Sequence, residues 1–218
     1  MDDKLERLLK SIDINTLDRA GLERLAGIRA ERWKLNRDGA IHLYEPQSYL
    51  DPISGKELYQ EAFHRSLKKC RWVFGGNRSG KTEIAIGAEP VWWAIGEHPF
   101  REVPDPCRGW IVSLDFNTSF QDAEKTFFKY LPKSRLSNYD KVRHTAYIKT
   151  KKGNISEVTF KSCDQGQDKF QGPSLDFIAY NEEPTAAIRQ ECSFRLLDRR
   201  GCEWCAETPT LGMSWTFD

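Results

Sequence analysis

Charged residues interrupt every hydrophobic run of this sequence, and no run approaches the roughly 20 apolar residues of a membrane-spanning helix. The pattern of a signal peptide is also missing, because the N-terminal stretch MDDKLERLLKS is acidic and amphipathic. Net charge is nearly absent as well, since 33 basic and 32 acidic residues leave a formal charge of +1. We therefore expect no membrane partner, and any contact with nucleic acid must come from a local basic patch.

Cysteines are few, and their spacing is not that of a disulfide framework in a chain of 218 residues. We interpret them as reduced thiols of a cytoplasmic protein. The only close pair is Cys202-x-x-Cys205. A zinc site would need a second such pair or a histidine partner, so two core or strand cysteines are the expected interpretation.

Neither a repeat nor a low-complexity segment occurs, and the composition, 39% hydrophobic and 12% aromatic, is that of a globular protein. Residues 1–39 carry apolar residues at helical spacing among charges, which predicts an N-terminal helical segment with Thr16 as the N-cap of its second helix. Residues 40–218 predict an α/β domain, because strands alternating with helices are typical of a mostly parallel sheet with helices on both faces.

The elements of this α/β domain are predicted from apolar patterning and from turn residues. An irregular lead-in at 40–52 precedes a helix at 57–66. Pro90 is expected to end or kink the helix that begins at Lys81. Strands are expected at 70–74, 109–116, 175–180 and 201–208, a hairpin at 145–160, and helices at 81–89, 119–132 and between the last two strands.

The stretch RWVFGGNRSGKTE contains Gly75-x4-Gly80-Lys81-Thr82, which matches the G-x-x-x-x-G-K-[ST] pattern of a phosphate-binding loop. An apolar strand precedes the match and a helical pattern follows it. The glycines let backbone N–H groups close around phosphate oxygens at the positive end of the helix. Lys81 would neutralise the β- and γ-phosphates of ATP, and Thr82 would offer its hydroxyl to Mg²⁺. The loop therefore predicts a P-loop NTPase fold of the RecA/ASCE-like type.

Hydrolysis needs a second strand that ends in acids, one near the metal ion and one that polarises the attacking water. The segment LDFIAYNEEP, residues 175–184, is an apolar strand that closes on Asn181, Glu182 and Glu183. Glu182 would be the general base, and Asn181 occupies the metal-side position.

Taken together, these features resemble the large terminase subunit of tailed bacteriophages, the motor that packages DNA into the capsid. The resemblance covers most of residues 44–218. It depends on three blocks in this order: FHRSLKKCRWVFGGNRSGKTE, FKSCDQGQDKFQGPSLDFIAYNEEP and CAETPTLGMSWTFD.

The resemblance assigns roles to matching positions. It implies that Arg78 acts on the γ-phosphate charge, and that Gln60, or less well Gln47, reads adenine. It implies a coupling motif in ETPT, residues 207–210, with Thr208 as the contact to the γ-phosphate. The complete set expected to bind the nucleotide is Gly75, Gly76, Asn77, Arg78, Ser79, Gly80, Lys81, Thr82 and Gln60.

Two departures from the family matter. Asn181 stands where an aspartate is usual, which leaves open natural variation, a change that stalls hydrolysis, or the use of Glu182 and Glu183 as the acidic pair. An amide lacks the charge that holds Mg²⁺ tightly, so Asn181→Asp is expected to raise ATP turnover or Mg²⁺ affinity. The sequence also ends at Asp218, before the nuclease domain of the family, and we expect no DNA cleavage by this chain alone.

As partners, the resemblance implies double-stranded DNA, the small terminase subunit, the portal protein and a homo-oligomeric ring, in the host bacterial cytoplasm and transiently at the procapsid portal vertex. Basic residues are dense at 65–71 and 133–153, and the stretch 149–152 is a candidate DNA contact. A basic finger offered to the neighbouring subunit's nucleotide could be Lys169, Arg101 or Arg108.

Two alternatives stay open at this point. The first is a helicase-like or repair ATPase that acts on free DNA. The second is a nucleotide-dependent assembly module that binds ATP and hydrolyses little, for which Asn181 is the best support.

Overall fold

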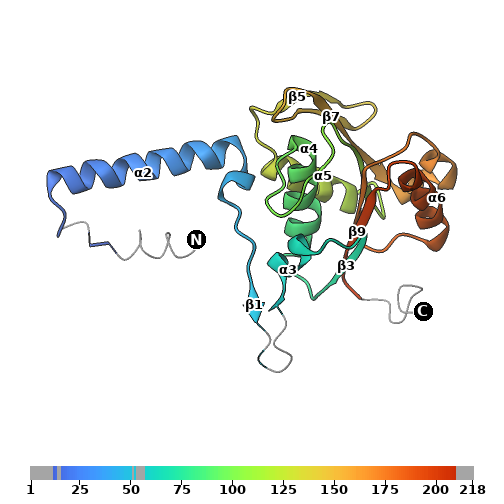
Figure 1. Ribbon diagram of the computed structural model, residues 1–218, viewed down its shortest axis with the longest axis horizontal. Helices are drawn as coiled ribbons and strands as arrows, with labels where there is room; N and C mark the ends of the chain where they lie inside the picture. The colour runs from blue at the N-terminus through green and yellow to red at the C-terminus, as the bar shows by residue number, and fades with distance from the viewer. Residues whose placement is uncertain (1–11, 14–15, 51, 53–56, 210–218) are drawn as a thin grey trace.

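The computed structural model describes residues 12–13, 16–50, 52 and 57–209 (Figure 1). Its centre is a seven-stranded mixed sheet in the order β3-β9-β8-β4-β7-β6-β5. The first five of these strands run parallel to one another, and β6 and β5 continue the sheet antiparallel. Their bounds are β3 Cys70–Phe74, β9 Cys202–Glu207, β8 Phe177–Asn181, β4 Arg108–Ser113, β7 Ile155–Ser162, β6 Thr145–Lys149 and β5 Leu136–Asp140.

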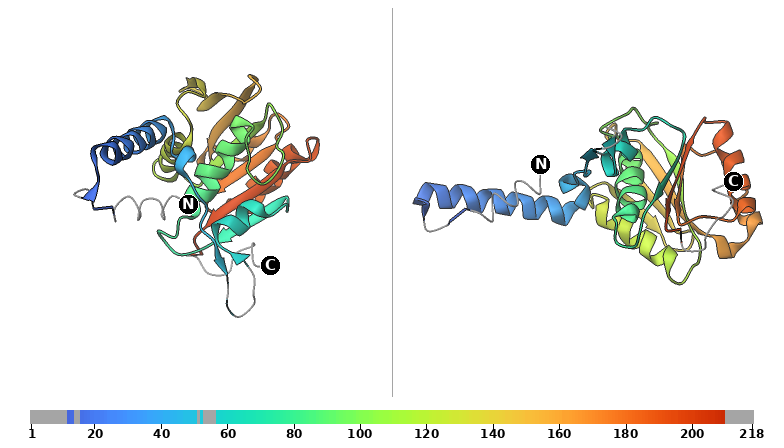
Figure 2. Two further views of the ribbon diagram at one scale, coloured as in Figure 1. Left: turned by 60° about the vertical axis from the view of Figure 1, so that its left-hand side comes forward. Right: turned by 90° about the horizontal axis from the view of Figure 1, so that it is seen from below.

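Helices cover both faces of this sheet, as the alternation of strands and helices predicted (Figures 1 and 2). On one face pack a π-helical segment η3 (Glu83–Ala88), α4 (Glu89–Ile95) and α5 (Ser119–Tyr130). On the other face pack α6 (Ala186–Leu197) and the short η5 (Gln167–Phe170). The apolar side of α5 explains its position, because Phe120, Ala123 and Phe127 recur at helical spacing and are all buried.

Pro90 does not end the helix after the glycine-rich loop, which corrects one of the two outcomes expected for it. The helix continues to Ile95 because η3 takes a π register, in which the Glu89 N–H donates to the Ile84 carbonyl five residues back. This register sets Pro90, which has no N–H, opposite the Ala85 carbonyl. The indole N–H of Trp204 donates to that carbonyl instead, at 2.7 Å. A tertiary hydrogen bond therefore satisfies the acceptor that the proline leaves open.

The helical N-terminal segment is confirmed in its described part, as α2 (Arg19–Asp38), which projects from the α/β body in Figure 1. Thr16 is not its N-cap: Asp18 takes that position and accepts from the Gly21 N–H at 2.7 Å. The other end is fixed to the domain, since both the N–H and the hydroxyl of Ser134 donate to the Asp38 carboxylate. The first predicted helix lies outside the described residues.

Two further expectations need correction. The helix predicted at 57–66 begins only at Gln60, as α3 (Gln60–Arg65), because Glu57–Leu58 form a strand β2 that pairs with β1 (Tyr49–Leu50). Strand β5 was not predicted, and the lead-in contains a 3-10 turn η2 (Ala40–Leu43). The strands at 70–74, 109–116, 175–180 and 201–208 and the hairpin at 145–160 are confirmed within a few residues.

No helix in the described part of the chain combines the length and the apolar character that crossing a membrane requires.

Candidate functional site

The candidate site lies where three parallel strands end at the same edge of the sheet. Phe74 at the end of β3 pairs with Glu207 of β9, and Asn181 at the end of β8 pairs with Ala206 of β9. The glycine-rich loop follows β3 directly, while Glu182 follows β8. Because neighbouring strands are about 4.8 Å apart, the start of the loop and Glu182 lie on the order of 10 Å apart, with the tip of β9 between them. The sequence therefore folds its phosphate-loop and acidic candidates to one edge.

The loop at 75–82 closes on itself and on β9. The Gly75 N–H donates to the Glu207 carbonyl at 3.3 Å, and the Ser79 N–H donates to the Gly76 carbonyl at 3.4 Å. Lys81, at the start of the helix, donates from Nζ to the same Gly76 carbonyl at 2.8 Å. The ammonium group is thus held over the loop, where it would meet an incoming anion.

Two glycines of this loop could not be replaced without disturbing it. A Cβ at Gly75 would lie 2.8 Å from Ser79 Oγ, and Gly80 has φ +83 with a Cβ position 2.8 Å from the Gln60 amide nitrogen. Ser79 Oγ is itself buried and has no hydrogen-bond partner among the described residues. A tight loop with an unsatisfied hydroxyl and a lysine fits a phosphate group. Three further residues of the predicted set, Gly76, Asn77 and Arg78, are exposed, and Thr82 is half-buried.

Glu182 and Thr208, predicted separately as the general base and the coupling residue, are in direct contact. The Thr208 N–H donates to Glu182 Oε2 at 2.9 Å, and the Thr208 hydroxyl donates to Oε1 at 3.1 Å. Glu182 also has φ +78, an uncommon conformation for a non-glycine residue, and its N–H donates to the Ala206 carbonyl. The carboxylate is therefore held at both oxygens by the end of β9. The other threonine of this motif, Thr210, lies outside the described residues.

Asn181 uses its amide inside the protein. Its Nδ2 donates to the Ser119 carbonyl in the first turn of α5 at 3.1 Å, and the residue is buried at 6% exposure. Its side chain points to the face that carries the helix after the glycine-rich loop, as those of Phe177 and Ala179 do, because strand side chains alternate. The geometry gives a reason for an asparagine here, since an aspartate could not donate this hydrogen bond.

Glu207 is a candidate site residue that the sequence did not predict, because the motif ETPT was expected to act through Thr208. It is buried, and its Oε2 has no hydrogen-bond partner in the described part of the chain. Burial raises the pKa of Glu207, and the charges of Glu183 and Glu182 raise it further. The motif ETPT contained this residue, but its burial depends on the sheet and leaves no local signal.

The two glutamines proposed to read adenine are placed very differently. Gln60 is buried at 6% exposure, and its Oε1 accepts from the Gln47 N–H at 3.0 Å and from the Tyr44 hydroxyl at 3.4 Å. Gln47 is exposed, and its carbonyl accepts from the Glu61 N–H. Gln60 thus fixes the lead-in against α3 and the loop, while Gln47 presents its side chain to the surface.

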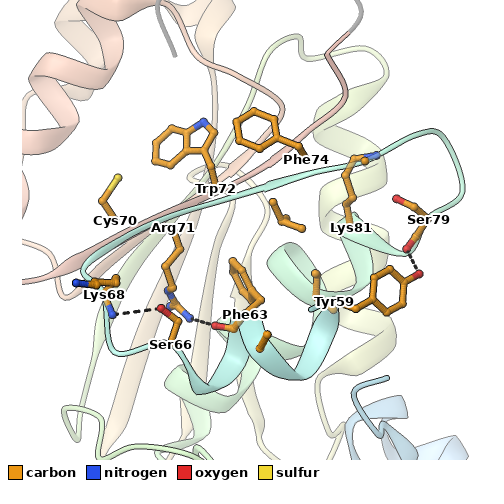
Figure 3. A pocket seen from close by; sticks show the side chains of 14 residues that line it. Tyr59, Phe63, Ser66, Lys68, Cys70, Arg71, Trp72, Phe74, Ser79 and Lys81 are labelled. Atoms are coloured by element: carbon orange, nitrogen blue, oxygen red, sulfur yellow. Dashed lines mark hydrogen bonds between the residues drawn. The ribbon is translucent and has the colours of Figure 1, made fainter. Parts of the chain in front are cut away.

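A cavity of about 570 Å³ opens beside the loop, along the outer side of β3 (Figure 3). Its loop end is formed by Ser79, Lys81 and Tyr59, and apolar side chains such as Phe63, Phe74 and Ile84 line its length. The cavity is continuous with the loop and offers an apolar surface next to it, which suits a nucleoside attached to bound phosphates.

A second group of ionisable residues lies in the core. The side-chain atoms of His64, Glu89 and His98 that face one another all lie within 4.8 Å, a spacing that could hold a metal ion. However, His98 Nδ1 accepts from the Phe100 N–H at 3.1 Å, so in the neutral ring the other nitrogen carries the proton and cannot be a ligand. We therefore assign this group as a hydrogen-bond network and not as a metal site.

Glu89 is the centre of this network and belongs to the helix that follows the loop. It accepts from His64 at 2.6 Å, from Arg71 of β3 at 2.7 Å and from Trp93 at 3.3 Å. Burial alone would raise the pKa of Glu89, but the hydrogen bonds from His64 and His98 and the charge of Arg71 lower it well below its ordinary value. Desolvation lowers the pKa of His64. The network ties β3, α3 and α4 together in the core.

The Cys202-x-x-Cys205 pair consists of strand residues, as expected. On β9 the two side chains point to opposite faces of the sheet, because Cys202 belongs to the core on one face and Cys205 to the core on the other. Burial raises the pKa of both thiols. One zinc ion could not bind both.

The basic residues proposed for DNA or for a neighbouring subunit are mostly engaged or distant. Arg101 donates to the Ser66 carbonyl, and Arg108 pairs with Glu157 at 2.9 Å, both at the sheet edge opposite the loop. The turn at 149–152 also lies at that opposite edge, beside a polar cavity that acids and bases line in mixed order. Lys169 is exposed. In the run 65–71, Arg71 is buried.

Comparisons of the chain with protein-family models, with curated proteins and with solved structures found no match. The fold itself, a mostly parallel α/β sheet with helices on both faces, is compatible with a Rossmann-like or P-loop-like architecture.

Proposed function

We propose that this chain binds ATP and Mg²⁺ at the 75–82 loop and hydrolyses ATP, as the ATPase motor domain of a viral DNA-packaging terminase. One observation carries the ATPase part: Glu182 lies at the same sheet edge as the loop, and Thr208 holds both of its carboxylate oxygens. An acid beside a phosphate-binding loop is the arrangement that nucleotide hydrolysis requires.

Each residue of the candidate site would have one role in binding ATP and Mg²⁺ or in hydrolysis. Lys81 would move from the Gly76 carbonyl to the phosphates, and the loop N–H groups would hold phosphate oxygens. Mg²⁺ would be held by the Thr82 hydroxyl and, through a water molecule, by Asn181. When bound, the ion would neutralise part of the phosphate charge. Glu182 would accept a proton from the attacking water, and Arg78 would offset charge on the γ-phosphate.

Translocation of double-stranded DNA into a procapsid is supported by the resemblance of the three sequence blocks to large terminase subunits. The same resemblance supports the small terminase subunit, the portal protein and further copies of this chain in a ring as partners. We expect the host bacterial cytoplasm as the location. Within the structure, the contact of Thr208 with Glu182 supports a coupling role for the end of β9.

Two substitutions test the ATPase proposal. Lys81→Ala is expected to abolish ATP binding, measured by calorimetry, because it removes the only side-chain cation of the loop that already faces a loop carbonyl. Glu182→Gln is expected to keep ATP binding and to lose hydrolysis, measured as phosphate release. Glu102→Gln, an exposed change of the same kind outside the site, is the control. Unchanged affinity in Lys81→Ala would refute the proposal.

A nucleotide-binding module with little hydrolysis is the second candidate, favoured by the Asn181 amide that faces Ser119. Turnover near zero in the wild-type chain with Mg²⁺, with the portal protein and DNA present, would favour the module. A third reading, a helicase-like ATPase, predicts stimulation by a forked duplex. The terminase proposal predicts stimulation by the portal protein with linear duplex DNA.

A further inference from the structure

Tyr59 has the least favourable backbone conformation near the site. Its angles are φ 83 and ψ −152, a region that is essentially restricted to glycine. The residue immediately precedes α3, and its carbonyl accepts from the Phe63 N–H at 3.2 Å. Such a conformation persists in a tyrosine only where the surrounding contacts compensate for it.

The side chain of Tyr59 makes its contact on the phosphate-binding loop. Its hydroxyl donates to the Ser79 carbonyl at 2.6 Å, a short hydrogen bond that Figure 3 shows at the loop end of the cavity. Gln60 follows in the chain and is buried against Gly80, with its amide nitrogen 2.8 Å from the position of a Cβ there. The adjacent residues Tyr59 and Gln60 thus contact the adjacent loop residues Ser79 and Gly80.

The direction of the Ser79 carbonyl fixes the direction of one backbone donor. In a trans peptide the carbonyl and the following N–H point to opposite sides, so the Gly80 N–H is directed away from the Tyr59 hydroxyl. Gly80 has φ +83 and no Cβ, and its peptide could rotate at little cost if nothing held it. Loops of this kind bind phosphates through backbone N–H groups.

We propose that Tyr59 is a positioning residue: by holding the Ser79 carbonyl, its hydroxyl orients the Gly80 N–H toward the phosphates of the bound nucleotide. The inference rests on the proposed function of the loop. It assigns to Tyr59 a role in phosphate binding that acts through the backbone of the loop, and it explains why a strained tyrosine precedes α3.

The test is Tyr59→Phe, which removes the hydroxyl and keeps the ring. Affinity for Mg-ATP and for inorganic tripolyphosphate, measured by calorimetry, should fall by the same factor of about three to ten, the range expected for one hydrogen bond. The Gly80 amide signal in a ¹⁵N–¹H spectrum should shift on substitution, while the melting temperature should fall by only about 1–6 °C, the cost of one hydrogen bond. Tyr147→Phe is the matched control, because β6 lies near the far end of the strand order from β3. It should change neither the two affinities, nor the Gly80 signal, nor the melting temperature.

Three results would overturn the role of Tyr59. Unchanged affinity in Tyr59→Phe, with affinity lost in Lys81→Ala, would leave the nucleotide site intact and refute the positioning. Weaker binding of ATP alone, with tripolyphosphate unaffected, would indicate contact with the nucleoside instead. A lower melting temperature with an unmoved Gly80 amide would indicate a structural role only. Unchanged affinity in Lys81→Ala would instead refute the proposed function.

Discussion

Asn181→Asp is expected to destabilise the free protein even if it improves the metal site. The Asn181 amide donates to the Ser119 carbonyl at 3.1 Å in a buried position, and a carboxylate would place an acceptor against that carbonyl. The Ser119 carbonyl keeps the Ser113 hydroxyl as a second donor at 3.3 Å, so the substitution loses one buried hydrogen bond, worth about 0.5–1.5 kcal/mol, and adds repulsion between two acceptors. For a chain of this size each kcal/mol lowers the melting temperature by roughly 2–4 °C.

Thermal unfolding without nucleotide measures this cost, with two controls. Asn181→Ala loses the donor and adds no charge, so its stability should fall less than that of Asn181→Asp. Asn138→Asp repeats the chemical change on an exposed residue of β5 and should leave the melting temperature unchanged. Acidification should reduce the difference in melting temperature between Asn181→Asp and the wild type, because a protonated carboxyl group can donate to the Ser119 carbonyl.

Adding Mg-ATP separates the structural role of this position from a metal-side role. If the residue faces the metal ion, Asn181→Asp should gain more stability from Mg-ATP than the wild type does, and its turnover or Mg²⁺ affinity should rise. If free Asn181→Asp melts at the wild-type temperature, the hydrogen bond to Ser119 contributes nothing and the reasoning is wrong.

Three further predictions concern the loop, the β9 contact and the core. Gly80→Ala should destabilise the protein and weaken ATP binding more than Gly153→Ala, measured by melting and calorimetry, because both have positive φ but only Gly80 meets a neighbouring side chain. Thr208→Val should slow phosphate release up to about tenfold at unchanged ATP affinity, since Glu182 loses one of its two donors from that residue. Stability should fall as the pH drops below the ordinary histidine pKa of about 6.5, because His64 has a lowered pKa and is neutral when folded, and His64→Gln should flatten this dependence.

Much of the fold could be predicted from the sequence because its signals are local. Apolar runs that end in glycines or acids marked β3 and β8, and the shared edge of parallel strands then brought Lys81 and Glu182 together. Thr208 was expected at the site because of the resemblance to large terminase subunits, and its two contacts with Glu182 depend on the three-dimensional fold.

The expectation for Pro90 failed because of a partner far away in the sequence. Pro90 is tolerated inside a helix because Trp204, 114 residues later, donates to the carbonyl that the proline leaves free. Neither the role of the Asn181 amide nor the conformation of Tyr59 has a local pattern. Such features are fixed by packing, which sequence periodicity does not report.

The last residues of β9 form backbone hydrogen bonds with the glycine-rich loop on one side and with the Glu182 segment on the other. Glu207 accepts from the first residue of the glycine-rich loop, while Ala206 accepts from the backbone of Glu182. Because the loop and Glu182 are bonded to the same strand end, a displacement of β9 would be transmitted to both segments together. A force that pulls on Thr208 would therefore act on the segments of Lys81 and Glu182 together, through the backbone hydrogen bonds of β9.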